Sequence, residues 1–130
     1  MIVIDTSVIV AIALKEAVAP ALLARLLNTS PRELSIVSYV EAATVLTPRG
    51  ATHDRIDDLL RQLDVVLVSV DEAQGREAIR ARIAYGKGSG HPAQLNFGDT
   101  FTYALAKTRG APLLFVGDDF SRTDLIDARA

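Results

Sequence analysis

The chain opens with an apolar run, Met1 to Ile4, that leads directly into Asp5. A short run of apolar, β-favouring residues is typical of a strand buried on both faces, as at the centre of a parallel sheet. Asp5 then lies at the carboxyl end of that strand, the edge at which open α/β sheets bind ligands. Because an isolated charge is costly to remove from water, the sequence predicts that another group in the fold partners this carboxylate.

The composition limits the class of protein. Of the 130 residues, 49% are hydrophobic, which is enough for a core, and we expect one domain over residues 1–130. The absence of cysteine excludes disulfides, thiolate metal sites and cysteine nucleophiles. No apolar run approaches the ~20 residues that span a bilayer, and no basic region precedes the first apolar run, so we expect a cytoplasmic protein without membrane contact. The net charge of −2 gives no general attraction for nucleic acid, so a nucleic-acid ligand would depend on bound metal.

Apolar runs alternate with helical patterns along the chain. After the first run, the segments typical of strands are 34–37, 65–70, 113–116 and a short last one at 125–128. The run at 65–70 is apolar except for Ser69, which favours an internal strand. Amphipathic helical periodicity links these runs singly or in pairs, including a helix expected from Ser38. The alternation predicts an α/β fold with a parallel sheet covered on both faces.

Several acids fall near strand or helix ends. Asp5 follows the first strand, Glu41 lies in the first turn of the helix after the second strand, and Asp118 and Asp119 follow the fourth strand. Strand carboxyl ends and the amino ends of the following helices share one edge of a parallel sheet, so these acids are expected to approach one another there. Asp99 opens a helix that precedes a strand, so its position depends on the path of the preceding loop.

Each acid also has an ordinary structural role open to it: N-caps at Asp5 and Asp99, a capping box of Ser38 and Glu41, and a turn at 118–119. Taken together, however, carboxylates crowded at one edge repel one another and require a cation. Because cysteine is absent and neither of the two histidines has a partner at ligand spacing, Mg²⁺ or Mn²⁺ fits better than zinc.

Basic residues in the second half of the chain are candidates for steering a phosphate backbone. Residues 71–110 hold six Lys/Arg against four Asp/Glu. The candidates are Arg76, Arg80, Arg82, Lys87 and Lys107, although a solvated helix face is the better explanation for most of them. Tyr103 lies one turn beyond Asp99 and either lines the acidic site or packs in the core.

Four segments carry a resemblance to a known family: VIDTSV at 3–8, SYVEAA at 38–43, LNFGDTFTYALAK at 95–107 and LLFVGDDFSRTD at 113–124. The chain resembles the PIN-domain nucleases, and more narrowly the VapC toxins of type II toxin–antitoxin pairs. The resemblance covers essentially the whole chain in the family's order, and the last two segments are the most specific. It implies a three-layer α/β/α PIN-like fold with a central parallel sheet of about five strands.

The resemblance also implies a function and a site. The function is a Mg²⁺- or Mn²⁺-dependent endoribonuclease toxin with an RNA substrate, a cognate antitoxin and a homodimeric state. The acids that correspond to the family's constellation, expected to hold the metal and support catalysis, are Asp5, Glu41, Asp99 and Asp118. Thr6 or Ser7 occupies the position of a supporting hydroxyl residue. Asp119 directly follows Asp118, where many family members separate the two late acids, so either of them can face the metal.

Two other functional classes are also considered. A PIN-like scaffold that has lost activity and only binds a protein partner is the alternative, although all four acids are retained. A phospho-acceptor receiver domain has a similar length and α/β pattern, but it requires paired acids after the first strand, where Asp5 stands alone. An RNA cleavage assay separates the nuclease from both.

Overall fold

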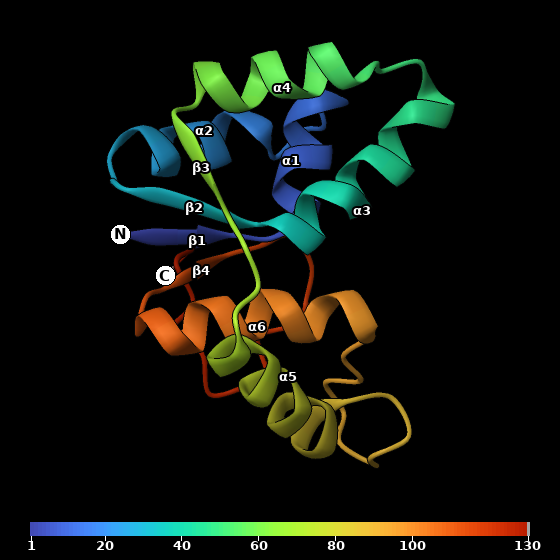
Figure 1. Cartoon of the computed structure of the whole chain (residues 1–130). Helices are drawn as coiled ribbons and strands as arrows, with labels where there is room; N and C mark the ends of the chain where they lie inside the picture. Colours follow the sequence, from blue (N-terminus) through green and yellow to red (C-terminus); the bar gives the residue numbers. More distant parts are fainter. Residues whose placement is uncertain (130) are drawn as a thin grey trace.

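A parallel four-stranded sheet lies between two layers of helices in the computed structural model, which describes residues 1–129 (Figure 1). The strand order is β3-β2-β1-β4, and every pairing is parallel. The strands are β1 (Ile2–Ile4), β2 (Arg32–Ser35), β3 (Val65–Val68) and β4 (Leu113–Leu114). The predicted parallel sheet with helices on both faces is therefore confirmed.

The two helical layers differ in size (Figure 1). One face of the sheet carries α1 (Thr6–Ala13), α2 (Ala19–Leu27), α3 (Ile36–Leu46) and α4 (His53–Gln62), with a 3₁₀ turn at Thr47–Arg49 between the last two. The other face carries α5 (Glu72–Tyr85) and α6 (Phe97–Arg109). Within residues 1–129, no helix is long and apolar enough to cross a membrane.

The central strand β1 contributes to the cores on both faces of the sheet. Ile2 and Ile4 pack in the core under α1 to α4, whereas Val3 packs in the core under α5 and α6. All three side chains are at most 1% exposed. Alternate residues of a strand point to opposite faces, so a strand between two helical layers needs apolar residues at every position. This explains why the first apolar run is unbroken.

Two strand predictions were wrong in detail. The run at 65–70 forms an edge strand rather than an internal one, because β3 pairs only with β2 and ends at Val68. Val66 and Leu67 are accordingly 51% and 40% exposed. The expected strand at 125–128 is reduced to one bridge, in which Leu113 donates to the carbonyl of Ile126 and accepts from the amide of Ala128, both at 2.9 Å.

Candidate active site

Asp5 lies where β1 passes into α1 and acts as the N-cap of that helix. Its Oδ2 accepts hydrogen bonds from the backbone N–H of Ser7 at 3.0 Å and from the Ser7 hydroxyl at 2.6 Å. The Ser7 hydroxyl oxygen in turn accepts from the backbone N–H of Val116 at 3.0 Å, which ties the end of β1 to the chain after β4. The carboxylate is only 7% exposed, so the cap also places a buried charge at the sheet edge.

The helix that carries Glu41 begins earlier than predicted. Ser35 caps α3 by accepting from the backbone N–H of Val37 at 3.2 Å, so the helix starts at Ile36 and not at Ser38. The proposed capping box of Ser38 and Glu41 is therefore wrong. Ser38 is a buried residue in the first turn of α3, and Glu41 lies in the second turn. Both Ser35 and Ser38 could cap a helix in this segment, and in the structure the strand ends at the first of them, Ser35.

Three hydroxyl groups connect α1, α3 and α6 around the acids. The Thr6 hydroxyl lies 3.1 Å from Glu41 Oε1 and 3.2 Å from the carbonyl of Ser38, and so connects α1 to α3. The Ser38 hydroxyl lies 2.9 Å from that of Thr102 on α6. Thr6 and Ser7, the residues expected to support the site, each contact one acid, Glu41 and Asp5 respectively. These contacts fix the directions in which the two carboxylates point.

Asp99 is held by the first turn of α6. Asn96 is the N-cap of this helix and forms a capping box with Asp99: the Asp99 N–H donates to Asn96 Oδ1 at 2.8 Å, and the Asn96 N–H donates to Asp99 Oδ2 at 3.0 Å. Asp99 is thus the third helical residue and not the N-cap. The box uses one carboxylate oxygen, so the same side chain can both cap the helix and face the acids.

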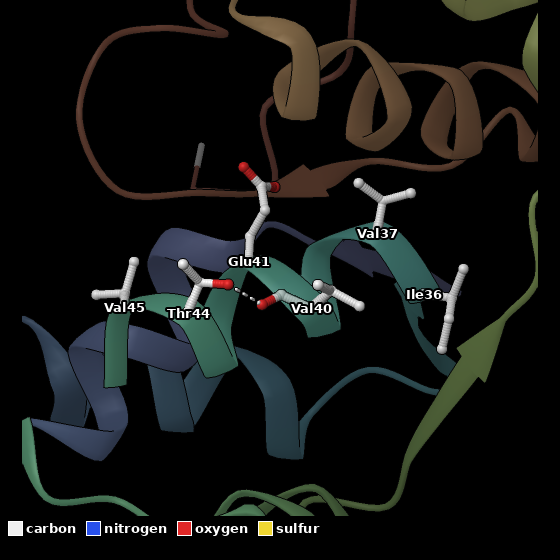
Figure 2. Close-up of a pocket in the computed structure, with 6 residues that line it drawn as sticks. All are labelled: Ile36, Val37, Val40, Glu41, Thr44 and Val45. Atoms are coloured by element: carbon white, nitrogen blue, oxygen red, sulfur yellow. Dashed lines mark hydrogen bonds between the residues drawn. The ribbon is translucent and has the colours of Figure 1, made fainter. Parts of the chain in front are cut away.

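Gly98 leaves room for the Glu41 carboxylate against α6, a role that the sequence prediction missed. A Cβ atom on Gly98 would overlap the carboxylate of Glu41. Glu41 points from α3 toward the α6 side of the molecule, between the exposed residues Val40 and Val45 (Figure 2). A glycine in the first turn of a helix, where it weakens the helix relative to alanine, was the available signal.

The carboxylates of Asp5, Glu41 and Asp99, called the acidic group below, act on one another electrostatically. The pKa of Asp99 is raised to about 7, mainly by burial and in part by the charges of Asp5, Asp119 and Glu41, while a hydrogen bond from Asn96 opposes the shift. Burial also raises the pKa of Asp5, although hydrogen bonds from Ser7 oppose the shift. The pKa of Glu41 is raised by burial and by the charge of Asp5. Within residues 1–129, none of these three carboxylates forms a salt bridge with a Lys or Arg.

The two late acids, Asp118 and Asp119, act on different charged groups. Asp119 is one of the charges that raise the pKa of Asp99. The pKa of Arg129 is raised mainly by its hydrogen bonds to Asp127 and, to a smaller extent, by the charge of Asp118. The carbonyl of Asp118 accepts from the Ser121 backbone and hydroxyl, at 3.1 and 2.7 Å, as in a turn. Of the two late acids, Asp119 is therefore the one whose charge is among the main causes of the raised pKa of Asp99.

The donors of the acidic group suit a hard divalent cation. All are carboxylate oxygens in a partly buried position, and within residues 1–129 none of them forms a salt bridge with a basic side chain. Mg²⁺ and Mn²⁺ prefer such ligands. In the described part of the chain, no three Asp, Glu or His side chains already form a ready metal site. An ion bound here therefore has to draw the carboxylates closer together. His91 lies elsewhere, with its Nδ1 accepting from Ala93 at 3.0 Å.

Tyr103 does not line the acidic group. Its side chain is 4% exposed, and its hydroxyl donates to Asp124 at 2.6 Å. Lys107 binds the other oxygen of Asp124, also at 2.6 Å. Tyr103 therefore packs in the core, and its hydroxyl binds Asp124 in the segment that follows β4.

The chain is similar to a protein family, to curated relatives and to solved structures. The family model of the PIN domain matches residues 2–126. Ribonuclease VapC42 of Mycobacterium tuberculosis is 42% identical over 125 residues, which cover 95% of each chain. The crystal structure of M. tuberculosis VapC20, described as a Sarcin-Ricin loop cleaving toxin, has a TM-score of 0.74 at 19% identity, with 98% of both chains covered. A toxin–antitoxin complex from Klebsiella pneumoniae has a TM-score of 0.73 at 13% identity, again over 98% of both chains. At these identities the two structures bear on the fold alone.

Proposed function

The chain belongs to the PIN domain family, with VapC ribonucleases among its relatives, and from this premise we propose that it is the endoribonuclease toxin of a type II toxin–antitoxin pair. The observation that carries the proposal is the acidic group itself. Three carboxylates from the end of β1, from α3 and from α6 are electrostatically coupled at one edge of the sheet. A fold that needed these acids only as helix caps would have no reason to bring them together.

We assign Asp5, Glu41 and Asp99 as the residues that hold Mg²⁺ or Mn²⁺, with Asp119 as the late acid whose charge acts on Asp99. Such an ion supplies a polarised phosphoryl oxygen, an activated water and neutralisation of the leaving oxygen, without a protein nucleophile. The chain supplies the orientation of the ligands: Ser7 fixes Asp5, Thr6 fixes Glu41, and the capping box fixes Asp99.

The protonation state of Asp99 limits when the site is ready for a cation. With a pKa of about 7, its carboxyl is close to half protonated at neutral pH. Binding of a cation requires the ionised form, so ion binding displaces a proton. We therefore expect cation affinity to rise as the pH increases through about 7.

The toxin role implies two kinds of partner, an RNA substrate and a cognate antitoxin, and we also propose a homodimer. The VapC name of the full-length relative supports the toxin role. Because the acidic group forms no salt bridge within residues 1–129, an antitoxin that inhibits the enzyme can do so by placing a Lys or Arg there. The inactive binding module is less well supported, since helix capping by Asp5 and Asp99 does not explain why Asp5 raises the pKa of Glu41 and why both raise that of Asp99.

The test is a cleavage map on total cellular RNA, with purified protein in Mg²⁺, in Mn²⁺ and in chelator. We expect the wild type to produce new 5′ ends at discrete sites only with metal, and Asp5→Ala to produce none. Circular dichroism of Asp5→Ala separates loss of catalysis from loss of folding. If the folded wild type cuts no RNA with either metal, the inactive binding module becomes the better description.

A further inference from the structure

A groove of about 520 Å³ lies between α5 and α6, beside the first turn of α6. Its apolar lining includes three residues that are far more exposed than is usual for their type: Ile79 at 61%, Ile83 at 73% and Phe97 at 74%. The Phe101 ring lies at the same surface, edge-on to Phe97 with 5.0 Å between ring centroids. The groove is therefore an exposed apolar surface that includes a pair of aromatic rings.

The charges around the groove are also distinctive. Four of the six Lys/Arg in residues 71–110 form ion pairs: Arg76 with Glu72, Arg80 with Glu77, Lys107 with Asp124 and Arg109 with Glu33. Within residues 1–129 the other two, Arg82 and Lys87, have no carboxylate partner, and both line the groove. Arg82 Nη1 donates to the carbonyl of Lys87 at 2.7 Å, which holds the two residues together.

The first turn of α6 contributes residues to both the groove and the acidic group. Phe97 is the first residue of α6, and Asp99 lies two positions later in the same turn. Asn96, the capping partner of Asp99, lines the groove as well. A ligand that binds both the acidic group and the groove therefore has to pass the first turn of α6, where Phe97 is exposed.

We propose that this groove binds a nucleotide of single-stranded RNA next to the scissile phosphate, with its base stacked on Phe97 and its phosphate near Lys87 and Arg82. The inference rests on the proposed ribonuclease function, and it adds the position of one nucleotide of the RNA substrate. A ring that stacks on bases and a positive rim that follows the backbone are the two elements of single-strand recognition. A second copy of the chain is a poorer occupant, because a two-fold interface uses the same patch of both copies and would bring the unpaired cations of both into it.

The test uses short RNAs that copy a cleavage site mapped on the wild type, with the fluorescent base 2-aminopurine at each position in turn. Binding is measured in the inactive Asp5→Ala background with Mg²⁺. We expect fluorescence quenching at one position next to the cleavage site. Phe97→Trp should keep the quenching, while Phe97→Leu, which keeps apolar surface but has no ring, should lose it and weaken binding about 5- to 150-fold. In the active protein, Phe97→Leu should raise KM more than it lowers kcat.

The cationic rim has its own matched pair of variants. Lys87→Ala should reduce the slope of log Kd against log salt by about 1, because one phosphate contact is lost. Arg76→Ala removes a cation from α5 that is already paired with Glu72, and it should leave the slope unchanged.

The outcomes separate this inference from the proposed function. If the wild type cleaves RNA but Phe97→Leu keeps the quenching, the affinity and the KM, the groove is not a nucleotide site and the ribonuclease proposal stands. If the wild type cleaves no RNA, the proposed function itself fails. If Phe97→Leu lowers the mass measured by light scattering, or weakens antitoxin binding, while RNA affinity is unchanged, the groove is a protein interface and the inference is overturned.

Discussion

At the scale of single residues, the close approach of Glu41 to α6 depends on the missing side chain of Gly98. We expect Gly98→Ala to push the Glu41 carboxylate away from Asp5 and Asp99, and a displacement of about 1 Å in a catalytic group can lower the rate about 10²-fold. The measurements are Mn²⁺ affinity by calorimetry and kcat/KM on a mapped RNA. Both should fall while the protein stays folded.

Gly75→Ala is the matched control for this substitution. Gly75 lies inside α5, and a Cβ atom there meets no other atom within 4 Å. The control should therefore gain about 0.5–1 kcal/mol in the free energy of unfolding, through better helix propensity, without affecting Mn²⁺ affinity. Equal Mn²⁺ affinity in the two variants would mean that Glu41 does not need the space at Gly98.

Asp99 should destabilise the metal-free protein at neutral pH. Its pKa is about 7 in the folded state against an ordinary 3.8, so between these values the folded state holds a proton that the unfolded chain releases. The free energy of unfolding therefore falls as the pH rises from 4 to 7. Asp99→Asn keeps an acceptor for the capping box and removes the charge, so we expect it to raise apo stability by about 1–2 kcal/mol at pH 8, allowing for solvent screening.

Urea unfolding of wild type and Asp99→Asn at pH 5 and pH 8, both in chelator, measures this effect. The difference between the two proteins should be larger at pH 8, and Asp99→Asn should not cleave RNA. A variant that is no more stable than the wild type at pH 8 and still cleaves RNA would contradict the role given to Asp99.

The two late acids provide a prediction with a built-in control. Asp119 raises the pKa of Asp99, whereas Asp118 acts on Arg129. Asp119→Asn should therefore lower the pH at which Mn²⁺ binding is half complete, while Asp118→Asn should not move it. Calorimetric titrations of both variants across pH 5.5 to 8.5 measure this midpoint. A shift seen only with Asp118→Asn would reverse the assignment.

At the scale of elements, local sequence patterns indicated each of the four strands of the sheet. They did not predict the position of a strand in the sheet, which depends on how the strands pair. The unbroken run of β1 correctly indicated a strand buried on both faces, and Asp5 followed as the residue at its end. The equally apolar run of β3 gave the same signal but lies at the sheet edge. Whether another strand pairs with β3 depends on the path of the rest of the chain, which periodicity does not contain.

The edge position of β3 leads to a stability prediction. Val66→Thr places a hydroxyl at a residue that is 51% exposed, so it should change the free energy of unfolding by less than about 0.5 kcal/mol. Val3→Thr makes the same change in β1 at a residue that is 0% exposed, and burying the hydroxyl should cost about 1–3 kcal/mol. Chemical denaturation of both variants measures the difference, and equal costs would place β3 inside the sheet.

At the scale of the whole molecule, the acidic group combines segments that lie far apart in the chain. Asp5, Glu41 and Asp99 could be nominated from the sequence, because each sits near a strand end or a helix start and matches the family pattern. Two other features depend on tertiary contacts, and the glycine in the first turn of α6 was only a local signal for the first of them. The space at Gly98 exists only because α3 meets α6, and the exposure of Phe97 only because no other element covers the groove between α5 and α6.

The central claim is that these acids form one site for a divalent ion, and calorimetric titration of the folded protein with Mn²⁺ tests it most directly. We expect binding that releases protons and strengthens as the pH rises through about 7, and that is lost or greatly weakened in Asp5→Ala and Asp99→Asn. Absence of Mn²⁺ binding at millimolar concentration, in a folded protein that still cleaves RNA, would contradict it.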